Sequence, residues 1–238
     1  MTADALEAYA EQGLEWLNEH EARTVLREYD IPCSADAFLP YEAGKAGADY
    51  LEDLEAADDA PGFPLYAKVA ARDIASVSDA GGVERVGSAD EFAAVAERLL
   101  DNVADAHPDA AIQGLLATED VGADRRELFL GAADDPQFGT VLSLGVGGIY
   151  VEVYRDVAFR VPPVEEADVR SMLDTLEGRA VLGSFRGMDP VDEDALVDAV
   201  LSFARLLEDH PEITEADVNP LMVGADGVVA ADALIRLG

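Results

Sequence analysis

The stretch that decides the fold lies near the C-terminus and reads DVNPLMVGADGVVAAD, residues 217–232. Apolar residues on both sides of the Asp226-Gly227 pair predict two strands joined by a tight turn. Alternate residues of a strand share a face, so Asp217 and Asn219 are expected on the same side. If the hairpin turns at Asp226-Gly227, Asp232 returns beside Asn219.

Three oxygen-bearing side chains on one face of a buried hairpin suit a hard cation. Mg²⁺ in particular keeps several waters and takes its remaining ligands from carboxylates and nucleotide phosphates. The alternative is a strand with polar outer-face residues and a turn-forming aspartate, because short patterns of oxygen ligands are unspecific. The rest of the chain has to decide between these interpretations.

The composition is that of an extremely acidic globular protein. The 238 residues are 50% hydrophobic and carry a net charge of −34, enough chain for one large domain or two modest ones. Such a surface repels nucleic acids and anionic membranes, so neither is expected as a partner. Because molar salt screens charges within about 3 Å, we expect a halophile's protein that loses stability in low salt.

A single cysteine, Cys33, excludes an internal disulfide and predicts a small core residue. No apolar run reaches the length of a membrane span, and the acidic N-terminus does not resemble a signal peptide. The sequence therefore favours a cytoplasmic location.

Lys68 is one of only two lysines and lies in the apolar run 65–70, which predicts a strand. A lysine there is costly unless it meets a charge, although an edge strand with a snorkelling lysine is the alternative. We favour a phosphate contact. The following loop, Ser78-Asp79-Ala80-Gly81-Gly82, has small residues that let backbone N–H groups approach an anion. By itself that loop is equally typical of a plain turn.

Strands and helices alternate irregularly, with hairpins as well as crossovers. This pattern predicts an α+β architecture in two lobes and not one doubly wound sheet. Residues 1–13 show no firm pattern and are expected to form an acidic extension, followed by lobes at 14–113 and 114–238.

Taken together, the motifs resemble the ATP-grasp subunit of the ADP-forming acyl-CoA synthetases, the acetate–CoA ligase type, which is related to the β subunit of succinyl-CoA synthetase. The resemblance covers about residues 14–238 and rests on the order and spacing of its pieces. These are residues 17–22 with 29–32, Lys68, residues 78–83, 135–139, 147–153, 156–160 and 185–187, and residues 217–221 with Asp232.

The resemblance implies an ATP-grasp fold, in which two α+β lobes grip ATP or ADP between them. It assigns Lys68 to the nucleotide phosphates, Asn219 and Asp232 to Mg²⁺, and Asp217 to a catalytic position beside them. The remaining implied nucleotide contacts are the hinge residues Glu119, Asp120 and Val121 and the phosphate-side residues Ser78, Asp79, Gly81, Gly82, Gly147 and Gly148.

The implied reaction converts acyl-CoA, ADP and phosphate reversibly into acid, CoA and ATP, through an acyl phosphate and a phosphohistidine. The histidine and the CoA site belong to an α subunit, so a hetero-oligomer is implied. The sequence does not specify the organic acid, the preference for ATP over GTP, or the stoichiometry.

The chain departs from its family at Ser76, a candidate catalytic position where many relatives carry a second phosphoryl-accepting histidine. Serine does not replace imidazole in this role without an activating base. Either the α-subunit histidine reaches the nucleotide directly, as in succinyl-CoA synthetase, or the chain is a non-catalytic or regulatory paralogue. His20, His107 and His210 are expected to be solvated surface residues.

Overall fold

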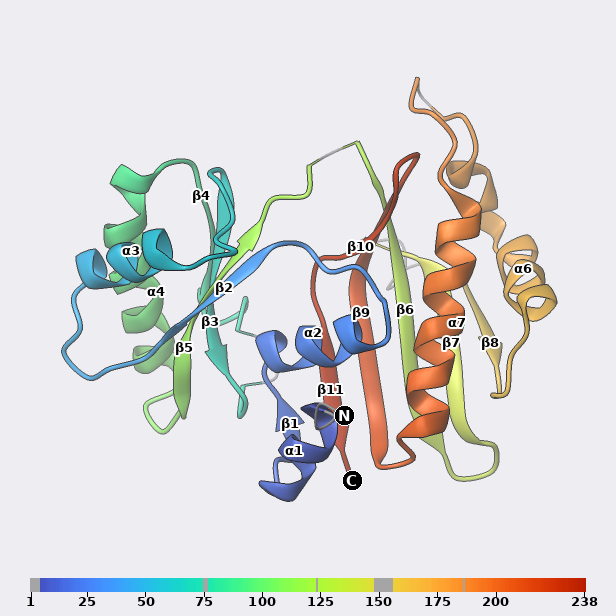
Figure 1. The fold of residues 1–238 in the computed structure, drawn as a ribbon, viewed down its shortest axis with the longest axis horizontal. Coiled ribbons are helices and arrows are strands. Elements are labelled where there is room, and N and C mark those ends of the chain that lie inside the picture. Colours follow the sequence, from blue (N-terminus) through green and yellow to red (C-terminus); the bar gives the residue numbers. More distant parts are fainter. Residues whose placement is uncertain (1–4, 75–76, 123, 148–155, 186) are drawn as a thin grey trace. The chain divides into compact units, whose positions relative to one another are not determined.

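The computed structural model describes residues 5–74, 77–122, 124–147, 156–185 and 187–238. The chain forms two compact units. The larger unit comprises Met1–Leu17, Glu21–Cys33 and Val121–Gly238, and the smaller comprises Asn18–His20 and Ser34–Asp120. Ser76 and Gly148 lie outside the described residues. The observed mixture of helices and antiparallel sheets confirms the α+β prediction (Figure 1).

The larger unit is built on a seven-stranded antiparallel sheet with the order β1-β11-β9-β6-β7-β8, in which β10 also pairs with β9. Its strands are β1 (Trp16–Leu17), β6 (Arg126–Asp135), β7 (Gly139–Val146), β8 (Val157–Arg160), β9 (Ile213–Gly224), β10 (Gly227–Ala230) and β11 (Leu234–Leu237). Its helices are α1 (Ala5–Glu11), most of α2 (Glu19–Glu28), α6 (Glu166–Thr175), the 3₁₀ turn η1 (Glu177–Leu182) and α7 (Glu193–Asp209).

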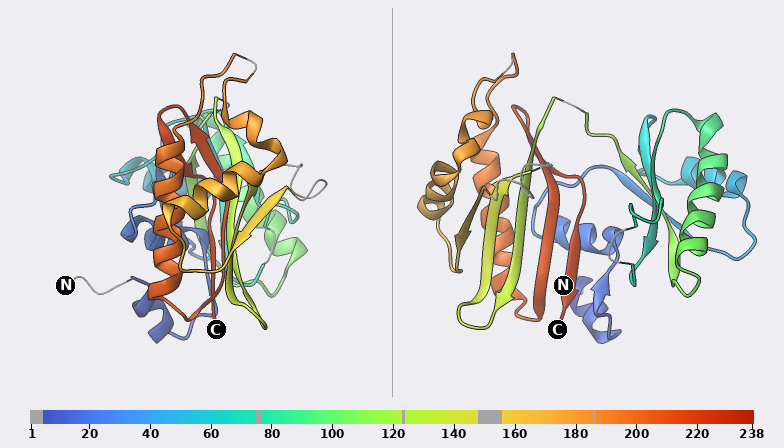
Figure 2. Two further views of the ribbon diagram at one scale, coloured as in Figure 1. Left: turned by 90° about the vertical axis from the view of Figure 1, so that its right-hand side faces the viewer. Right: turned by 180° about the vertical axis from the view of Figure 1, so that it is seen from behind.

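Helices α6 and α7 cover one face of this sheet (Figure 2). Alternate residues of β6, such as Leu128 and Leu130, are fully buried in the core that these helices complete. Phe129 and Gly131, which alternate with these leucines, lie on the opposite face, as the two-residue period of a strand requires. Cys33 is half-buried and next to Ala230, where it packs on this core as expected from the sequence.

The smaller unit has a four-stranded antiparallel sheet with the order β2-β5-β3-β4. Its strands are β2 (Asp36–Pro40), β3 (Leu65–Ala71), β4 (Val83–Val86) and β5 (Ile112–Glu119), and its helices are α3 (Gly47–Ala56) and α4 (Ala89–Ala106). Both helices contribute to the core on one face of the sheet, against residues such as Leu115 and Ala117. The other residues of β5, Leu116 and Thr118, therefore belong to the face away from the helices.

Two details differ from the sequence expectation. Residues 5–11 form helix α1, and its Leu6 is completely buried in the larger core, which gives this acidic segment an anchor. The expected boundary at residues 113 and 114 falls inside β5, whose residues are paired on both sides with β2 and β3. The compact units change at Asp120 and Val121, because a strand paired on both edges is not divided between two folding units.

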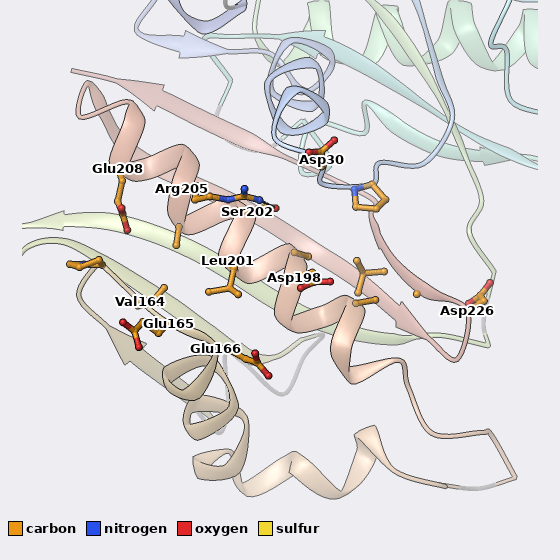
Figure 3. Close-up of a pocket in the computed structure, with 17 residues that line it drawn as sticks. Asp30, Val164, Glu165, Glu166, Asp198, Leu201, Ser202, Arg205, Glu208 and Asp226 are labelled. Carbon is orange, nitrogen blue, oxygen red and sulfur yellow. Dashed lines mark hydrogen bonds between the residues drawn. The ribbon is translucent and has the colours of Figure 1, made fainter.

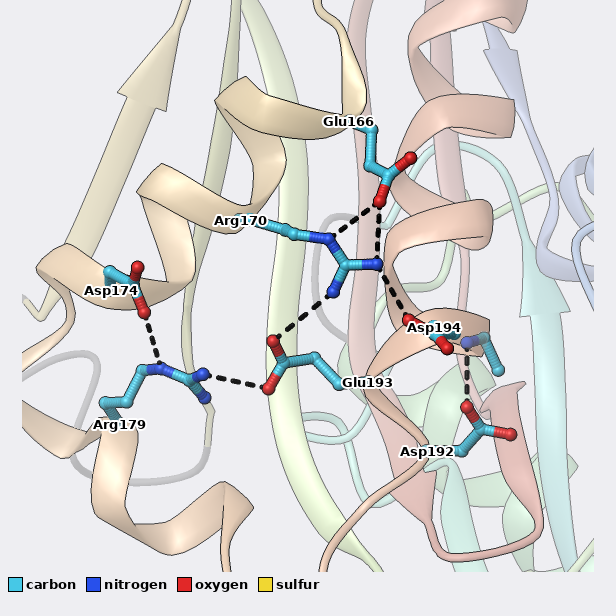
Figure 4. A network of polar contacts seen from close by, with 8 residues as sticks. Glu166, Arg170, Asp174, Arg179, Asp192, Glu193 and Asp194 are labelled. Carbon is cyan, nitrogen blue, oxygen red and sulfur yellow. Dashed lines mark hydrogen bonds and ion pairs between the residues drawn. The ribbon is translucent and has the colours of Figure 1, made fainter.

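The exposed side of α6 and α7 is joined by an ion-pair network (Figure 4). Arg170 contacts Glu166 at 2.8 Å and Asp194 at 2.7 Å, and Arg179 contacts Glu193 at 2.9 Å. Asp192 caps α7 by accepting a hydrogen bond from the backbone N–H of Ala195. The chain has few basic residues, and both Arg170 and Arg179 form ion pairs with more than one carboxylate. Among the described residues, no helix combines the length and apolar character needed to cross a bilayer.

Candidate functional site

The predicted C-terminal hairpin is present with the predicted register. Strand β10 pairs with β9 from Gly227 opposite Gly224 to Ala230 opposite Leu221, and the N–H of Ala231 donates to the carbonyl of Pro220. The next residue, Asp232, therefore stands level with Asn219. The register argument made from the Asp-Gly turn is confirmed, while β11 continues the pairing with Leu234 opposite Asp217.

The strand β9 carries an irregularity at the site itself. Leu128 of β6 is opposite Leu221, but Leu130 is opposite Val218, so Asn219 and Pro220 together oppose one residue of β6. This is a β-bulge, which turns the side chains of the longer strand locally. Asn219 is exposed, in contrast to the buried Val218 before it.

Asp217 is half-buried on the sheet face away from α6 and α7, since Ala216 and Val218 on either side of it are in the core. Burial, reinforced by the charges of Glu215 and Asp232, raises the pKa of Asp217 to about 6. Gly131 lies opposite Asp217, and a Cβ there would come within 2.5 Å of its Oδ1. Gly131 thus leaves room for the carboxylate of Asp217, which is repelled by the charges of Glu215 and Asp232.

Arg23 of helix α2 holds the segment between β10 and β11. Its side chain is completely buried, and its guanidinium donates a short hydrogen bond to the carbonyl of Ala231. The residue after that carbonyl is Asp232, whose Oδ1 accepts from the N–H of Ala233. The backbone beside the carboxylate cluster is therefore held by a buried cation.

The donor chemistry of this cluster fits Mg²⁺. Its side chains offer carboxylate and amide oxygens, which are the ligands of hard cations, and a cation would relieve the mutual repulsion of Glu215, Asp217 and Asp232. The described residues contain no group of three or more histidine, cysteine or acidic side chains arranged to hold a metal by themselves. Water and nucleotide phosphates would have to complete the coordination.

In the smaller unit, Lys68 is partnered by Glu19. The ammonium of Lys68 lies 2.8 and 3.0 Å from the two carboxylate oxygens of Glu19, and both side chains are mostly buried. The strand containing Lys68 is paired on both edges, with β4 and β5, so the edge-strand alternative does not hold. The lysine lies on the sheet face opposite to α3 and α4.

His20 keeps 37% of its side chain exposed, as expected of a surface residue, but its ring has specific partners. Its Nδ1 lies 2.8 Å from Oδ2 of Asp36, a carboxyl with only 1% exposure, and its ring stacks on Phe38 at 5.3 Å between centroids. His210 departs from the expectation, because it is buried and contacts Glu212. The partner of His20 lies 16 residues away in the sequence, which leaves no local pattern from which to predict the pair.

The glycine loop after β3 uses its N–H groups internally. The N–H of Gly81 donates to the carbonyl of Ser78, and that of Gly82 donates to Val77. Gly81 has a φ of +69°, and a Cβ on Gly82 would lie 2.4 Å from the side chain of Val77. The tight turn therefore requires glycine at both positions, at Gly81 for its positive φ and at Gly82 for lack of space. Asp79 lies in the same turn, so the structure brings the predicted loop residues together.

The other predicted nucleotide residues also have local structural roles. Glu119 ends β5 and exchanges hydrogen bonds with Ala35, and Asp120 accepts from Arg85 at 2.7 Å. Val121 begins the last segment of the larger unit. Gly147 donates its N–H to the carbonyl of Glu127 at 2.7 Å.

The described residues of the larger unit line a pocket beside Asp217 and another along α7. One of about 770 Å³ is lined by Asp217 and Glu215 and by the exposed rings of Phe138 and Phe159. The other, of about 960 Å³, runs along α7 (Figure 3). Its rim carries carboxylates, among them Asp30, Asp198 and Glu208, and among its lining residues only Arg205 is basic. Such a rim repels phosphates, so the α7 groove is unsuited to a nucleotide.

The sequence did not predict the parts played by Glu19, Glu215, Arg23 and the His20–Asp36 pair. Glu215 could have been predicted, because it lies two residues before Asp217 and so belongs to the same face of a strand as Asp217 and Asn219. The partners of Lys68 and His20 left no such pattern, since they lie 49 and 16 residues away in the chain.

Comparison with known proteins places these features in a family. The ATP-grasp domain model matches residues 8–237. The chain is 34% identical to the acetate–CoA ligase [ADP-forming] II subunit beta of Pyrococcus furiosus, over 100% of this chain and 99% of that subunit. It is 38% identical to the acetate–CoA ligase [ADP-forming] I of Archaeoglobus fulgidus over 74% of this chain, but spans only 26% of that protein.

Among solved structures, acetyl-coenzyme A synthetase 1 of Ca. Korarchaeum cryptofilum, in complex with coenzyme A, Ca-AMPCP and HgCl⁺, matches with a TM-score of 0.89 and 33% identity, covering 100% of both chains. A second structure of that synthetase contains Mg-AMPPCP and has its phosphohistidine segment pointing towards the nucleotide binding site. The resemblance inferred from the motifs is thereby confirmed: this chain belongs to the ATP-grasp domain family and is a homologue of the β subunits of ADP-forming acetate–CoA ligases.

Proposed function

We propose that this chain is the nucleotide-binding β subunit of an ADP-forming acyl-CoA synthetase. It would transfer a phosphoryl group between ATP or ADP and a phosphohistidine on an α subunit. The proposal rests on the end-to-end similarity to a β subunit. It is supported by a lysine and a carboxylate cluster, each on the sheet face of its unit that lies away from the helices.

Lys68 would contact the nucleotide phosphates and neutralise charge on the transferring group. Asn219 and Asp232 would hold Mg²⁺, which supplies a Lewis acid for the phosphoryl oxygens, and Asp217 would act beside them. Glu119, Asp120 and Val121 would contact the base and ribose. Gly81, Gly82 and Gly147 would line the phosphate side by leaving space for close approach, because their N–H groups are already used.

The coupling partner would be an α subunit carrying the CoA site, so the working protein is a hetero-oligomer. The net charge of −34 supports function in a salt-rich cytoplasm, where screening removes most of the self-repulsion. The second candidate, a non-catalytic or regulatory ATP-grasp subunit, is favoured by a single observation, the serine at position 76. A succinyl-CoA synthetase-like ligase is the third.

Calorimetry with ADP or ATP and Mg²⁺ in molar KCl tests the nucleotide site directly. Binding that disappears without Mg²⁺ is expected, and no binding at any salt concentration would refute every nucleotide-dependent function. Co-expression with an α subunit, followed by assay of acetyl-CoA, ADP and phosphate, then separates the candidates. ATP formation excludes the regulatory function, whereas binding without turnover supports it.

A further inference from the structure

A row of paired residues crosses the larger sheet on the face away from α6 and α7. Gly131 of β6 is paired with Asp217 of β9 on one side and with Ser143 of β7 on the other. Ser143 is in turn paired with Phe159 of β8. Neighbouring strands lie about 4.8 Å apart, so these three steps carry the row about 14 Å across the sheet. The row begins at the proposed nucleotide site and ends at a residue to which the proposed function gives no part.

This row lies in the pocket of about 770 Å³, which is called the β6–β8 trough from here on. The middle of the trough is shallowly filled, because the two central residues of the row are glycine and serine. The hydroxyl of Ser143 donates to the carbonyl of Gly131 at 3.1 Å and is therefore used within the sheet. The next pair on the same face, Ala133 with Val141, is also small. The trough thus has a floor of small side chains between a carboxylate end and an aromatic end.

The aromatic end of the trough exposes apolar side chains to water. Five large apolar side chains are exposed in the described residues, and three of them line this trough: Phe138 at 65%, Phe159 at 60% and Val161 at 48%. Exposed apolar residues scattered singly need no explanation, but a group of them on one surface marks an interaction site. In a chain with a net charge of −34, their concentration in one place indicates a surface that a partner covers.

Both exposed rings are carried by backbone that is already held in place. Oδ1 of Asp135 accepts hydrogen bonds from two N–H groups of the β6–β7 turn, including that of Phe138 at 3.1 Å. Arg160 donates to the carbonyl of Phe159 at 2.8 Å and to the hydroxyl of Ser171 at 3.0 Å, which ties β8 to α6. A partner therefore meets a surface that needs little further ordering, so less conformational entropy is lost on binding.

The charge of the trough restricts the partner that fits it. Glu215 and Asp217 line its inner end, and among the described lining residues only Arg160 is basic. The guanidinium of Arg160 lies 3.9 Å from Asp168 of α6 and has a carboxylate of its own. A complementary segment presents apolar side chains to the two rings and a basic side chain to Glu215. Because molar salt screens charges beyond about 3 Å, the basic group has to make direct contact, and the apolar contacts carry the rest.

We propose that the β6–β8 trough is the docking surface for an apolar, basic segment of the α subunit. The inference rests on the proposed function and adds the place at which the partner binds. A phosphoryl acceptor has to come within about 3–3.5 Å of the transferring phosphorus, so the α subunit has to stand over the face that carries Asp217. The trough extends from Asp217 toward β8, whereas Asp232 lies on the other side of β9, beside β11. A segment in the trough therefore leaves the proposed metal ligands uncovered.

Photocrosslinking locates the partner directly. The full chain with p-benzoylphenylalanine in place of Phe159 is mixed with the co-expressed α subunit in molar KCl and irradiated. We expect a crosslink from position 159 to the α subunit, and none when the same residue replaces Tyr41, which is 43% exposed in the smaller unit. Equal crosslinking from both positions, no crosslink from position 159, or a crosslink from it to a second copy of this chain overturns the proposal.

Binding measurements separate the docking surface from the nucleotide site. The double variant Phe138→Ser with Phe159→Ser is expected to weaken binding of the α subunit roughly tenfold or more, with Tyr41→Ser as the matched control. Calorimetry with ATP and Mg²⁺ is expected to give the same affinity for all three proteins. Wild-type affinity of the double variant for the α subunit refutes the docking surface, as does a wild type that binds ATP but no α subunit. A wild type that binds no ATP refutes the proposed function itself.

Discussion

The ammonium of Lys68 lies between the two carboxylate oxygens of Glu19, at 2.8 and 3.0 Å. This pair has the form used in protein kinases, where a glutamate on a helix aims a strand lysine at nucleotide phosphates. The ion pair also neutralises the positive charge of Lys68, whose burial on a strand would otherwise be unfavourable. Lys68 is thus held in one direction before any phosphate arrives.

Replacing Lys68 by alanine is expected to reduce turnover of the α–β complex by about a hundredfold or more, because the lysine neutralises charge on the transferring group. Lys45→Ala is the control: it removes the same charge from an ion pair with Asp53 at α3. Steady-state kinetics and nucleotide calorimetry on both variants make the measurement. Wild-type turnover in Lys68→Ala would remove this residue from the proposed site.

The ionisation of Asp217 should make the folded state less stable as the pH rises. Its pKa of about 6 is higher than the value of 3.8 for a free aspartate, so the folded state holds the proton more tightly than the unfolded chain. The penalty is absent below pH 4, grows between pH 4 and 6, and is complete above pH 6, where it reaches at most about 3 kcal/mol.

Asp217→Asn is therefore expected to raise the free energy of unfolding at pH 8 and to leave it nearly unchanged at pH 4. Asp198→Asn, which removes an exposed carboxylate of α7, controls for the general loss of negative charge. Denaturant unfolding in molar KCl at several pH values gives the comparison. Equal effects of the two variants at pH 8 would show that burial does not raise the pKa of Asp217.

The buried guanidinium of Arg23 is expected to contribute far more to the stability of the folded state than a surface arginine on the same helix does. Arg23→Met leaves the carbonyl of Ala231 without this donor and is expected to cost about 2–4 kcal/mol of stability. Arg27→Met, one turn later on an exposed position, is expected to change stability by less than about 1 kcal/mol.

Because Ala231 adjoins Asp232, a stabilised Arg23→Met background should still bind Mg²⁺-nucleotide more weakly than Arg27→Met does. Titration of nucleotide at several Mg²⁺ concentrations reports this effect separately from folding. An Arg23→Met protein that is as stable as Arg27→Met, with the same Mg²⁺ dependence, contradicts the role given to this contact.

Dilution of salt should lower the melting temperature. The Debye length grows from about 3 Å at 1 M to about 10 Å at 0.1 M, so repulsion among the acidic side chains then acts over longer distances. Melting curves in KCl from 0.1 to 3 M test this, with sucrose as a control that stabilises compact states without screening charge. Recovery of stability by sucrose alone, to the level reached in molar KCl, would exclude screening as the cause.

The sequence by itself determined those features that depend on neighbours along the chain. The turn at Asp226-Gly227 and the alternation through Asp217 and Asn219 were enough to predict the hairpin and the position of Asp232, because strand register follows from turn and period. The order of the motifs predicted the family, and the charge of the chain predicted the kind of partner it repels.

Only the tertiary structure decided which groups the site residues meet. The pairing of Lys68 with Glu19, the orientation of His20 by Asp36, and the burial of Asp217 among carboxylates join residues from different strands and helices. A side chain's charge state and direction depend on its surroundings in space, and no periodicity along the chain records those surroundings.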